Sequence, residues 1–118
     1  MNEIIFNDKL EEKISYIKQS LKTKAREYAG HTNRYSNFER AAKISKTLPE
    51  VVMFNYMLKH FVSYIDMLET LQSNPNVKYD EAYIKEKFGD IINYFILSEI
   101  YFLHNNCIRK QDTIENES

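Results

Sequence analysis

Glycine, proline and cysteine are all scarce in this chain of 118 residues, which contains 2 Gly, 2 Pro and 1 Cys. β-Sandwiches and barrels need many tight turns, and tight turns depend on glycine and proline, so the composition argues against an all-β fold. Glycine stands only at positions 30 and 89, which excludes a GxGxxG or P-loop phosphate cradle. The single cysteine, Cys107, excludes an internal disulfide and a multi-cysteine zinc site.

An excess of charge of one sign is also missing. The 16 basic and 17 acidic residues give a net charge of −1, so we expect no direct DNA binding. No apolar run approaches the ~18 residues that cross a bilayer. The most apolar stretch, 91–103, is interrupted by Asn93 and Glu99, and the N-terminus carries Glu3 and Asp8 where a signal peptide is cationic. We therefore expect a cytoplasmic protein with no membrane partner.

What the sequence does contain is helical periodicity. Apolar residues make up 43% of the chain and recur at steps of three and four, which predicts amphipathic helices. The expected helices span about residues 8–29, 36–46, 49–72 and 80–105. Gly30 should end the first helix, and the Asn74-Pro75 pair should separate the third from the fourth.

Two capping boxes are predicted at helix starts. Ser36 with Glu39 fits the first, and Thr47 with Glu50 fits the second, with Pro49 in the first turn of its helix. Asp80 should cap the fourth helix. We expect a single helical domain over residues 1–108 and a flexible tail over 109–118.

The third and fourth predicted helices are apolar on more than one side, which is typical of helices that are buried most of the way round. We therefore predict an all-α four-helix bundle with a central antiparallel hairpin of these two helices. Residues of the hairpin should pair where their numbers sum to about 152. Three neighbouring helices can hardly cover so much apolar surface. We therefore expect a homo-oligomer, with a dimer as the default.

Polar residues inside these two helices are the candidate site. On the third helix one stripe contains Asn55, Lys59, Ser63 and Asp66, with His60 beside it. On the fourth helix a second stripe contains Glu86, Asp90 and Asn93. The expected register places Asp66 level with Glu86 and Lys59 level with Asn93. Lys59, His60 and Ser63 should lie within about one turn of Asp90.

Two interpretations of the stripes remain open. In the first, they form an internal network in which Lys59 or His60 pairs with Asp90 and fixes the helix register. In the second, they form a ligand pocket in which Asp66, Glu86 and Asp90 supply oxygen ligands for Mg²⁺ and Lys59 faces a phosphate.

The loop before the second helix is a weaker candidate. Arg34 and Asn37, with His31 nearby, stand at a helix N-terminus that can hold an anion, although a plain capped turn explains them too. Cys107 with His104 lacks a third group to orient it, so a cysteine nucleophile is not expected.

Three segments that contain these candidate residues resemble a pattern found in a known group of proteins. The segments from Arg34 to Phe38, from Lys59 to Asp66 and from Glu86 to Tyr94 read R-x-x-N-F, K-H-x-x-S-x-x-D and E-K-x-G-D-x-x-N-Y. The pattern resembles small phage and prophage proteins of the nucleotide-modification-associated, domain-of-unknown-function type, over roughly residues 26–100. The resemblance implies a helical protein inside a bacterial host.

More distantly, the pattern is similar to all-α nucleoside triphosphate pyrophosphohydrolases of the MazG kind. Those enzymes oppose an E-E-x-x-E helix to an E-x-x-D helix around Mg²⁺. This chain departs from that pattern, since Glu86 and Asp90 are four residues apart and the third helix offers Asp66 alone. Glu11 and Glu12 match the first two carboxylates of the E-E-x-x-E motif, but the third carboxylate is missing.

Two classes of function follow from the sequence. The first is a homo-oligomeric phage-type protein that binds a host or phage macromolecule, a protein partner above all, in counter-defence or host takeover. The second is Mg²⁺-dependent binding or hydrolysis of a nucleotide. A nucleotide-specific thermal shift distinguishes them, because a ligand that binds only the native state stabilises it.

Overall fold

The computed structural model describes residues 1–28 and 33–108. The described residues form four helices and no strand: α1 (Glu3–Tyr28), α2 (Ser36–Ser45), α3 (Pro49–Ser73) and α4 (Glu81–Asn105). The all-α prediction is confirmed. Gly30, His31 and the predicted tail at 109–118 lie outside the described residues.

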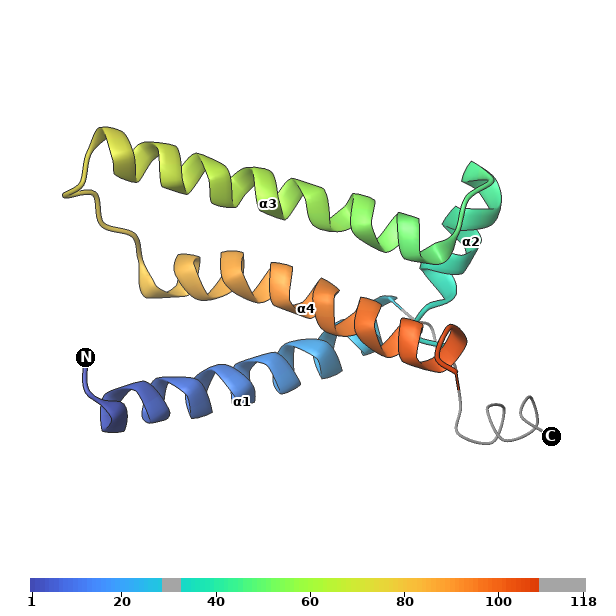
Figure 1. Cartoon of the computed structure of the whole chain (residues 1–118), viewed down its shortest axis with the longest axis horizontal. Helices are drawn as coiled ribbons and strands as arrows, with labels where there is room; N and C mark the ends of the chain where they lie inside the picture. Colours follow the sequence, from blue (N-terminus) through green and yellow to red (C-terminus); the bar gives the residue numbers. More distant parts are fainter. Residues whose placement is uncertain (29–32, 109–118) are drawn as a thin grey trace.

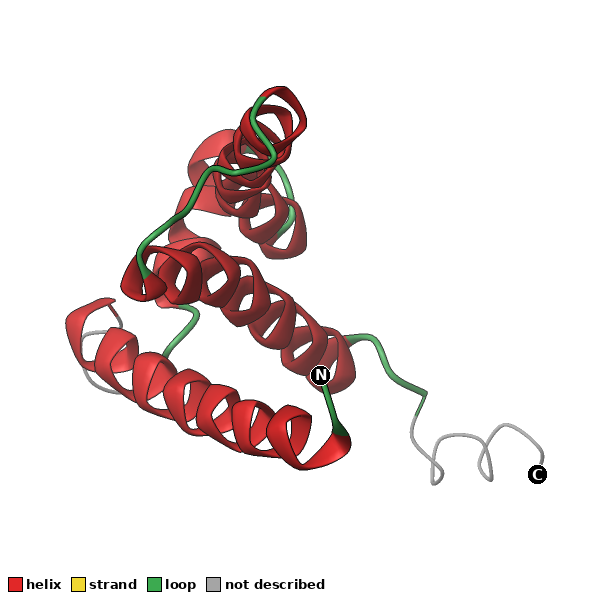
Figure 2. Cartoon of the chain, turned by 90° about the vertical axis from the view of Figure 1, so that its left-hand side faces the viewer, coloured by secondary structure: helices red, strands yellow, loops and turns green. Residues whose placement is uncertain are grey.

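Helix α4 lies between α3 and α1, and α2 crosses one end of the array against α3 (Figure 1). Helices α3 and α4 run antiparallel (Figure 1) and pack more extensively than any other pair of the described helices. Figure 2 shows the array turned by 90°, with the described helices joined by loops. The rings of Tyr64 and Phe88 are 5.1 Å apart and meet edge to face, in the predicted register. The central hairpin is therefore confirmed.

Helix α1 runs parallel to α4 and packs on the side of α4 away from α3 (Figure 1). Two hydrogen bonds fix this register: Lys13 Nζ donates to the Lys85 carbonyl at 3.2 Å, and Asn93 Nδ2 donates to Ser20 Oγ at 2.9 Å. Both contacts join residues more than seventy positions apart, so local sequence does not encode them.

The helix ends differ from the predicted caps. Helix α1 begins earlier than expected, because the Asn2 side chain accepts a hydrogen bond from the Ile5 amide at 2.9 Å. The N-cap positions of α2, α3 and α4 make no side-chain capping bond. The first predicted capping box is wrong because Glu39 accepts hydrogen bonds from Asn33 and Tyr101 instead.

The second predicted box is also wrong, since Leu48 rather than Thr47 is the N-cap of α3. Pro49 does occupy the first turn of α3, as predicted. Asp80 does occupy the N-cap position of α4.

The fully buried apolar core is small. Among the described residues it contains Ala42, Val52, Met53 and Met57. Many large apolar side chains on α1, α3 and α4 are instead more than a third exposed. None of the described helices has both the length and the apolar character needed to cross a membrane.

Candidate anion-binding pocket

A pocket of about 270 Å³ opens where α1, the start of α2, α3 and α4 meet. Its lining comes from every helix of the fold: Leu21, Lys24, Ala25, Arg34, Asn37, Phe38, Tyr56, Lys59, Tyr94 and Leu97. The pocket exists only in the folded chain, because these residues are spread over more than seventy positions of the sequence.

The pocket is cationic. Lys24, Arg34 and Lys59 line it, and none of the described residues that line it is an aspartate or glutamate. Arg34 Nη1 donates a hydrogen bond to the Leu21 carbonyl at 3.1 Å, which ties the segment before α2 to α1. Lys59 forms no ion pair or hydrogen bond with another described residue. An anion entering the pocket would therefore meet a guanidinium held in place at Arg34 and an ammonium at Lys59 that no described carboxylate pairs with.

Aromatic rings form the apolar part of the pocket. The Phe38 ring lies 5.7 Å from the Tyr56 ring and 6.3 Å from the Tyr94 ring, in tilted and edge-on geometry. Offset contacts of this kind hold the rings in place and stabilise the cluster. A ligand with a planar ring finds aromatic surface here next to the cations.

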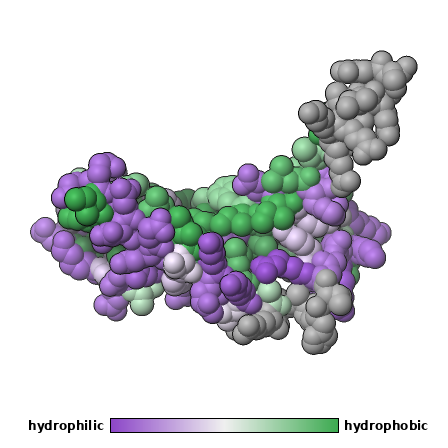
Figure 3. Space-filling model, turned by 90° about the horizontal axis from the view of Figure 1, so that it is seen from below, coloured by the Kyte–Doolittle hydropathy of each residue, from purple (hydrophilic) through white to green (hydrophobic). Residues whose placement is uncertain are grey.

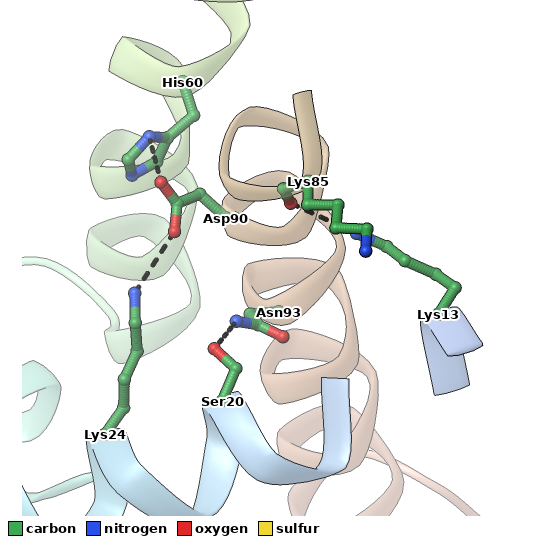
Figure 4. A network of polar contacts seen from close by, with 7 residues as sticks. All are labelled: Lys13, Ser20, Lys24, His60, Lys85, Asp90 and Asn93. Carbon is green, nitrogen blue, oxygen red and sulfur yellow. Dashed lines mark hydrogen bonds and ion pairs between the residues drawn. The ribbon is translucent and has the colours of Figure 1, made fainter. Parts of the chain in front are cut away.

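Asp90 joins Lys24, which lines the pocket, to His60 in a small polar network (Figure 4). Its Oδ1 is 3.3 Å from Lys24 Nζ on α1, and its Oδ2 is 3.5 Å from His60 Nδ1 on α3. The Asp90 side chain is only 16% exposed, so its charge needs these partners. One carboxylate thus links three helices and holds Lys24 at the pocket wall.

His60 is the neutral member of this network. Burial lowers the pKa of His60, and the nearby lysines lower it further, whereas the attraction of Asp90 opposes the shift. The imidazole is therefore uncharged at neutral pH, and its contact with Asp90 is polar rather than a full ion pair. His60 also stacks on Tyr94 with 5.5 Å between ring centroids.

Asn93 and Gly89 form the close contact between α4 and α1. Asn93 is 2% exposed, and its Oδ1 has no hydrogen-bond partner in the described part of the chain. A Cβ atom added at Gly89 would lie 2.8 Å from Cε1 of Tyr16. The glycine is therefore required by the approach of α1, since real side chains do not pack that closely.

The predicted site residues divide into groups. Arg34, Asn37 and Lys59 line the pocket, while His60 and Asp90 lie in the network beside it. The predicted pairing of Asp90 with His60 agrees with this geometry, but Lys59 does not pair with Asp90. Lys59 lies about 100° further round α3 than His60 and so meets the pocket instead.

Other predicted positions are placed differently from the expectation. Asn93 turns toward Ser20 of α1 rather than toward Lys59. Ser63 is half-buried but does not line the pocket.

The three carboxylates proposed as Mg²⁺ ligands are not brought together. Asp66 and Glu86 are exposed, whereas Asp90 faces Lys24 and His60. The described residues contain no group of three or more His, Cys, Asp or Glu placed to hold a metal ion. The donor set therefore does not fit Mg²⁺, because two of the three side chains turn to solvent.

Two important residues carry no clear signal in the sequence. Lys24 stands among other lysines on the polar side of α1, and only the packing of α1 against α4 selects it as the partner of Asp90. Tyr56 is one of 9 tyrosines, and nothing local marks it as a pocket residue.

Comparison with protein-family models, curated proteins and solved structures gives no match to this chain. The resemblance to small phage proteins therefore stays a prediction. The structure does bring the quoted motifs together: Arg34 and Asn37 from the first, Lys59 from the second and Tyr94 from the third line one pocket.

Proposed function

We propose that this protein binds a small anionic ligand with a planar ring, of the size and chemistry of a nucleoside monophosphate. One observation supports this above all: three cationic side chains and three aromatic rings line the same pocket, and none of its described lining residues is acidic. Cations and aromatic surface are the groups that recognise the phosphate and the base of a nucleotide.

Different lining residues would contact the phosphate and the ring of the ligand. Arg34 and Lys59 would receive the phosphate, because a guanidinium and an ammonium both donate charge-assisted hydrogen bonds to phosphate oxygens. Lys24 would add a third cationic donor from α1, where its ion pair with Asp90 holds it. Phe38 and Tyr56 would contact the ring.

The size of the pocket limits the ligand. Its volume of about 270 Å³ lies just below the range of about 300–1,000 Å³ typical of drug-sized ligands. One mononucleotide is of this scale, while a longer chain would have to extend into solvent. We therefore propose a mononucleotide or a single terminal nucleotide as the ligand.

Binding is better supported than metal-dependent hydrolysis. The carboxylates that a pyrophosphohydrolase of the MazG kind would use are dispersed over the surface, apart from Asp90, which is paired with Lys24. We accordingly expect binding that does not depend on Mg²⁺. The other function expected from the sequence, binding of a host or phage macromolecule, rests on apolar surface, which does not distinguish a foreign protein from a second copy of this chain.

Calorimetric titration tests the proposal directly. Purine and pyrimidine nucleoside monophosphates are titrated with and without Mg²⁺, alongside inorganic phosphate and the matching nucleosides. We expect the nucleotides to bind more tightly than either fragment, because the cations and the rings act together. Equal affinity for phosphate alone would show that the pocket recognises only the anion and not the ring. If none of these ligands binds, the proposal is overturned.

Matched variants assign the binding to this pocket. Lys59→Met keeps the length of the side chain and removes its charge, and we expect a loss of ~10-fold or more, since a charged hydrogen bond contributes about 1.5–3 kcal/mol. Tyr56→Leu should cost a similar factor through lost stacking, about 1–3 kcal/mol. The control is Lys22→Met, which removes an exposed lysine of α1 outside the pocket. An equal loss in the control would place the binding elsewhere.

A further inference from the structure

Helix α3 carries a heptad pattern on its outer side. Apolar residues recur at alternating steps of three and four: Val51, Phe54, Leu58, Phe61, Ile65 and Leu68. All of these except Phe61 are between 41% and 51% exposed. A seam of this period is the pattern by which one helix packs against another along its length.

Helix α4 extends the same surface. Phe88, Phe95 and Phe102 are each seven residues apart and are 37%, 53% and 51% exposed. Phe61 of the α3 seam meets Phe95 edge to face, with 6.0 Å between ring centroids. The seam and these phenylalanines thus form one surface, which we call the α3–α4 apolar face.

The pocket lies on a different side of the hairpin. Tyr56 and Lys59 point away from the seam, because each lies more than 100° round α3 from its centre at about 100° per residue. The packing surface of α1 on α4 is also separate, since it uses Lys85, Gly89 and Asn93. No described helix covers the α3–α4 apolar face. Apolar surface reaches solvent elsewhere too, as a band along the long axis of the molecule (Figure 3).

From these observations we propose that a second copy of this chain covers the α3–α4 apolar face, forming a two-fold dimer. Within a single chain, few apolar side chains of the described residues are buried completely, and a small domain with so little core is marginal without added burial. The partner that buries the α3–α4 apolar face must therefore be present whenever the chain is folded. A second copy of the chain meets that condition. In a two-fold dimer, the α3 seam of one copy packs against the same seam of the other copy. No charged side chain then lies at the centre of the contact.

The area is sufficient for a stable dimer. Eight residues of the face are exposed: Val51, Phe54, Leu58, Ile65, Leu68, Phe88, Phe95 and Phe102. At roughly 80 Å² for each half-exposed large side chain, two copies would bury about 1,300 Å². Stable interfaces bury about 1,200–2,000 Å² in total.

Sedimentation of the full chain tests this assignment. We expect the wild type to be a dimer, and we expect Leu58→Glu and Phe95→Glu to shift it to monomer, because each buries a charge in the apolar face. The control is Ile44→Glu, which makes the same kind of change at a residue of α2 that is 84% exposed and outside the face. That variant should stay dimeric.

A second measurement covers the case in which the glutamate variants fail to fold. If folding and association are coupled, the melting temperature of the wild type should rise by several degrees when its concentration is raised about a hundredfold. A wild type that sediments as a monomer and melts at a constant temperature would falsify the proposal. An oligomer that survives both glutamate variants in folded form would assign the contact to another surface. Lys59→Met should leave sedimentation unchanged, so failure of the pocket proposal and failure of this one are distinguishable.

Discussion

The carboxylate of Asp90 on α4 lies 3.3 Å from the ammonium of Lys24 on α1. This contact does two things for the fold and the site. It compensates a carboxylate that is largely removed from water, and it holds a cation at the wall of the pocket. Asp90 is therefore a positioning residue for the proposed ligand, although it does not line the pocket itself.

Asp90→Asn should lower the free energy of unfolding by about 1–3 kcal/mol, because it weakens hydrogen bonds to a charged group. Lys24→Met should also destabilise, and the double variant should cost less than the two single losses together. Urea unfolding measures all three. Asp66→Asn is the control, since that carboxylate is exposed and should change stability by less than ~0.5 kcal/mol. A stabilised Asp90→Asn protein would show that the network does not support the fold.

His60 should make the free energy of unfolding decrease as the pH falls. Burial holds the pKa of His60 below its value in the unfolded chain, which is about 6.5. As the pH falls below that value, the unfolded chain takes up the proton first, so the free energy of unfolding decreases until the folded His60 is also protonated. Above pH ~6.5 the group has no such effect.

The measurement is urea unfolding of wild type and His60→Gln between neutral and mildly acidic pH. The variant should lose less stability over this window, because its side chain does not titrate. Asp90, Lys24, Lys59 and Lys87 all act on His60, so the curves are compared at one ionic strength. Parallel curves for the two proteins would contradict the assignment.

Gly89→Ala should destabilise the protein by about 1–3 kcal/mol through overpacking against Tyr16, in spite of the better helix propensity of alanine. The added Cβ would lie 2.8 Å from Tyr16 Cε1. Combining it with Tyr16→Leu should recover part of the loss, since the shorter side chain leaves room. Thermal unfolding compares the single and double variants. A Gly89→Ala protein as stable as the wild type would mean that α1 can shift away.

Ser20→Ala should cost about 1–3 kcal/mol, because it leaves the buried Asn93 amide without its partner. The pair Ser20→Ala with Asn93→Leu should be nearly neutral, since both polar groups are then gone. Asn93 already has one unpartnered buried oxygen among the described residues, which favours that outcome. Additive losses in the double variant would instead show that Asn93 contributes through another contact.

Much of the fold followed from local pattern. The periodicity of residues 49–72 and 80–105, with the break at Asn74 and Pro75, predicted α3, α4 and their hairpin nearly as observed. The register brought His60 to Asp90 because antiparallel neighbours joined by a short loop have little freedom to slide. Pro49 began its helix for a local reason as well, since its missing N–H costs nothing in a first turn.

The caps and the site depended on contacts that no local pattern encodes. Glu39 fits a capping box in sequence, but it accepts a hydrogen bond from Tyr101, 62 positions away. Lys24 resembles any exposed lysine of α1 until α1 packs beside α4. The sequence by itself thus determined the helices and the hairpin, because periodicity and breakers act within a few residues. Only the tertiary structure decided which cations line the pocket and which carboxylates turn to solvent, because those outcomes depend on how separate helices pack.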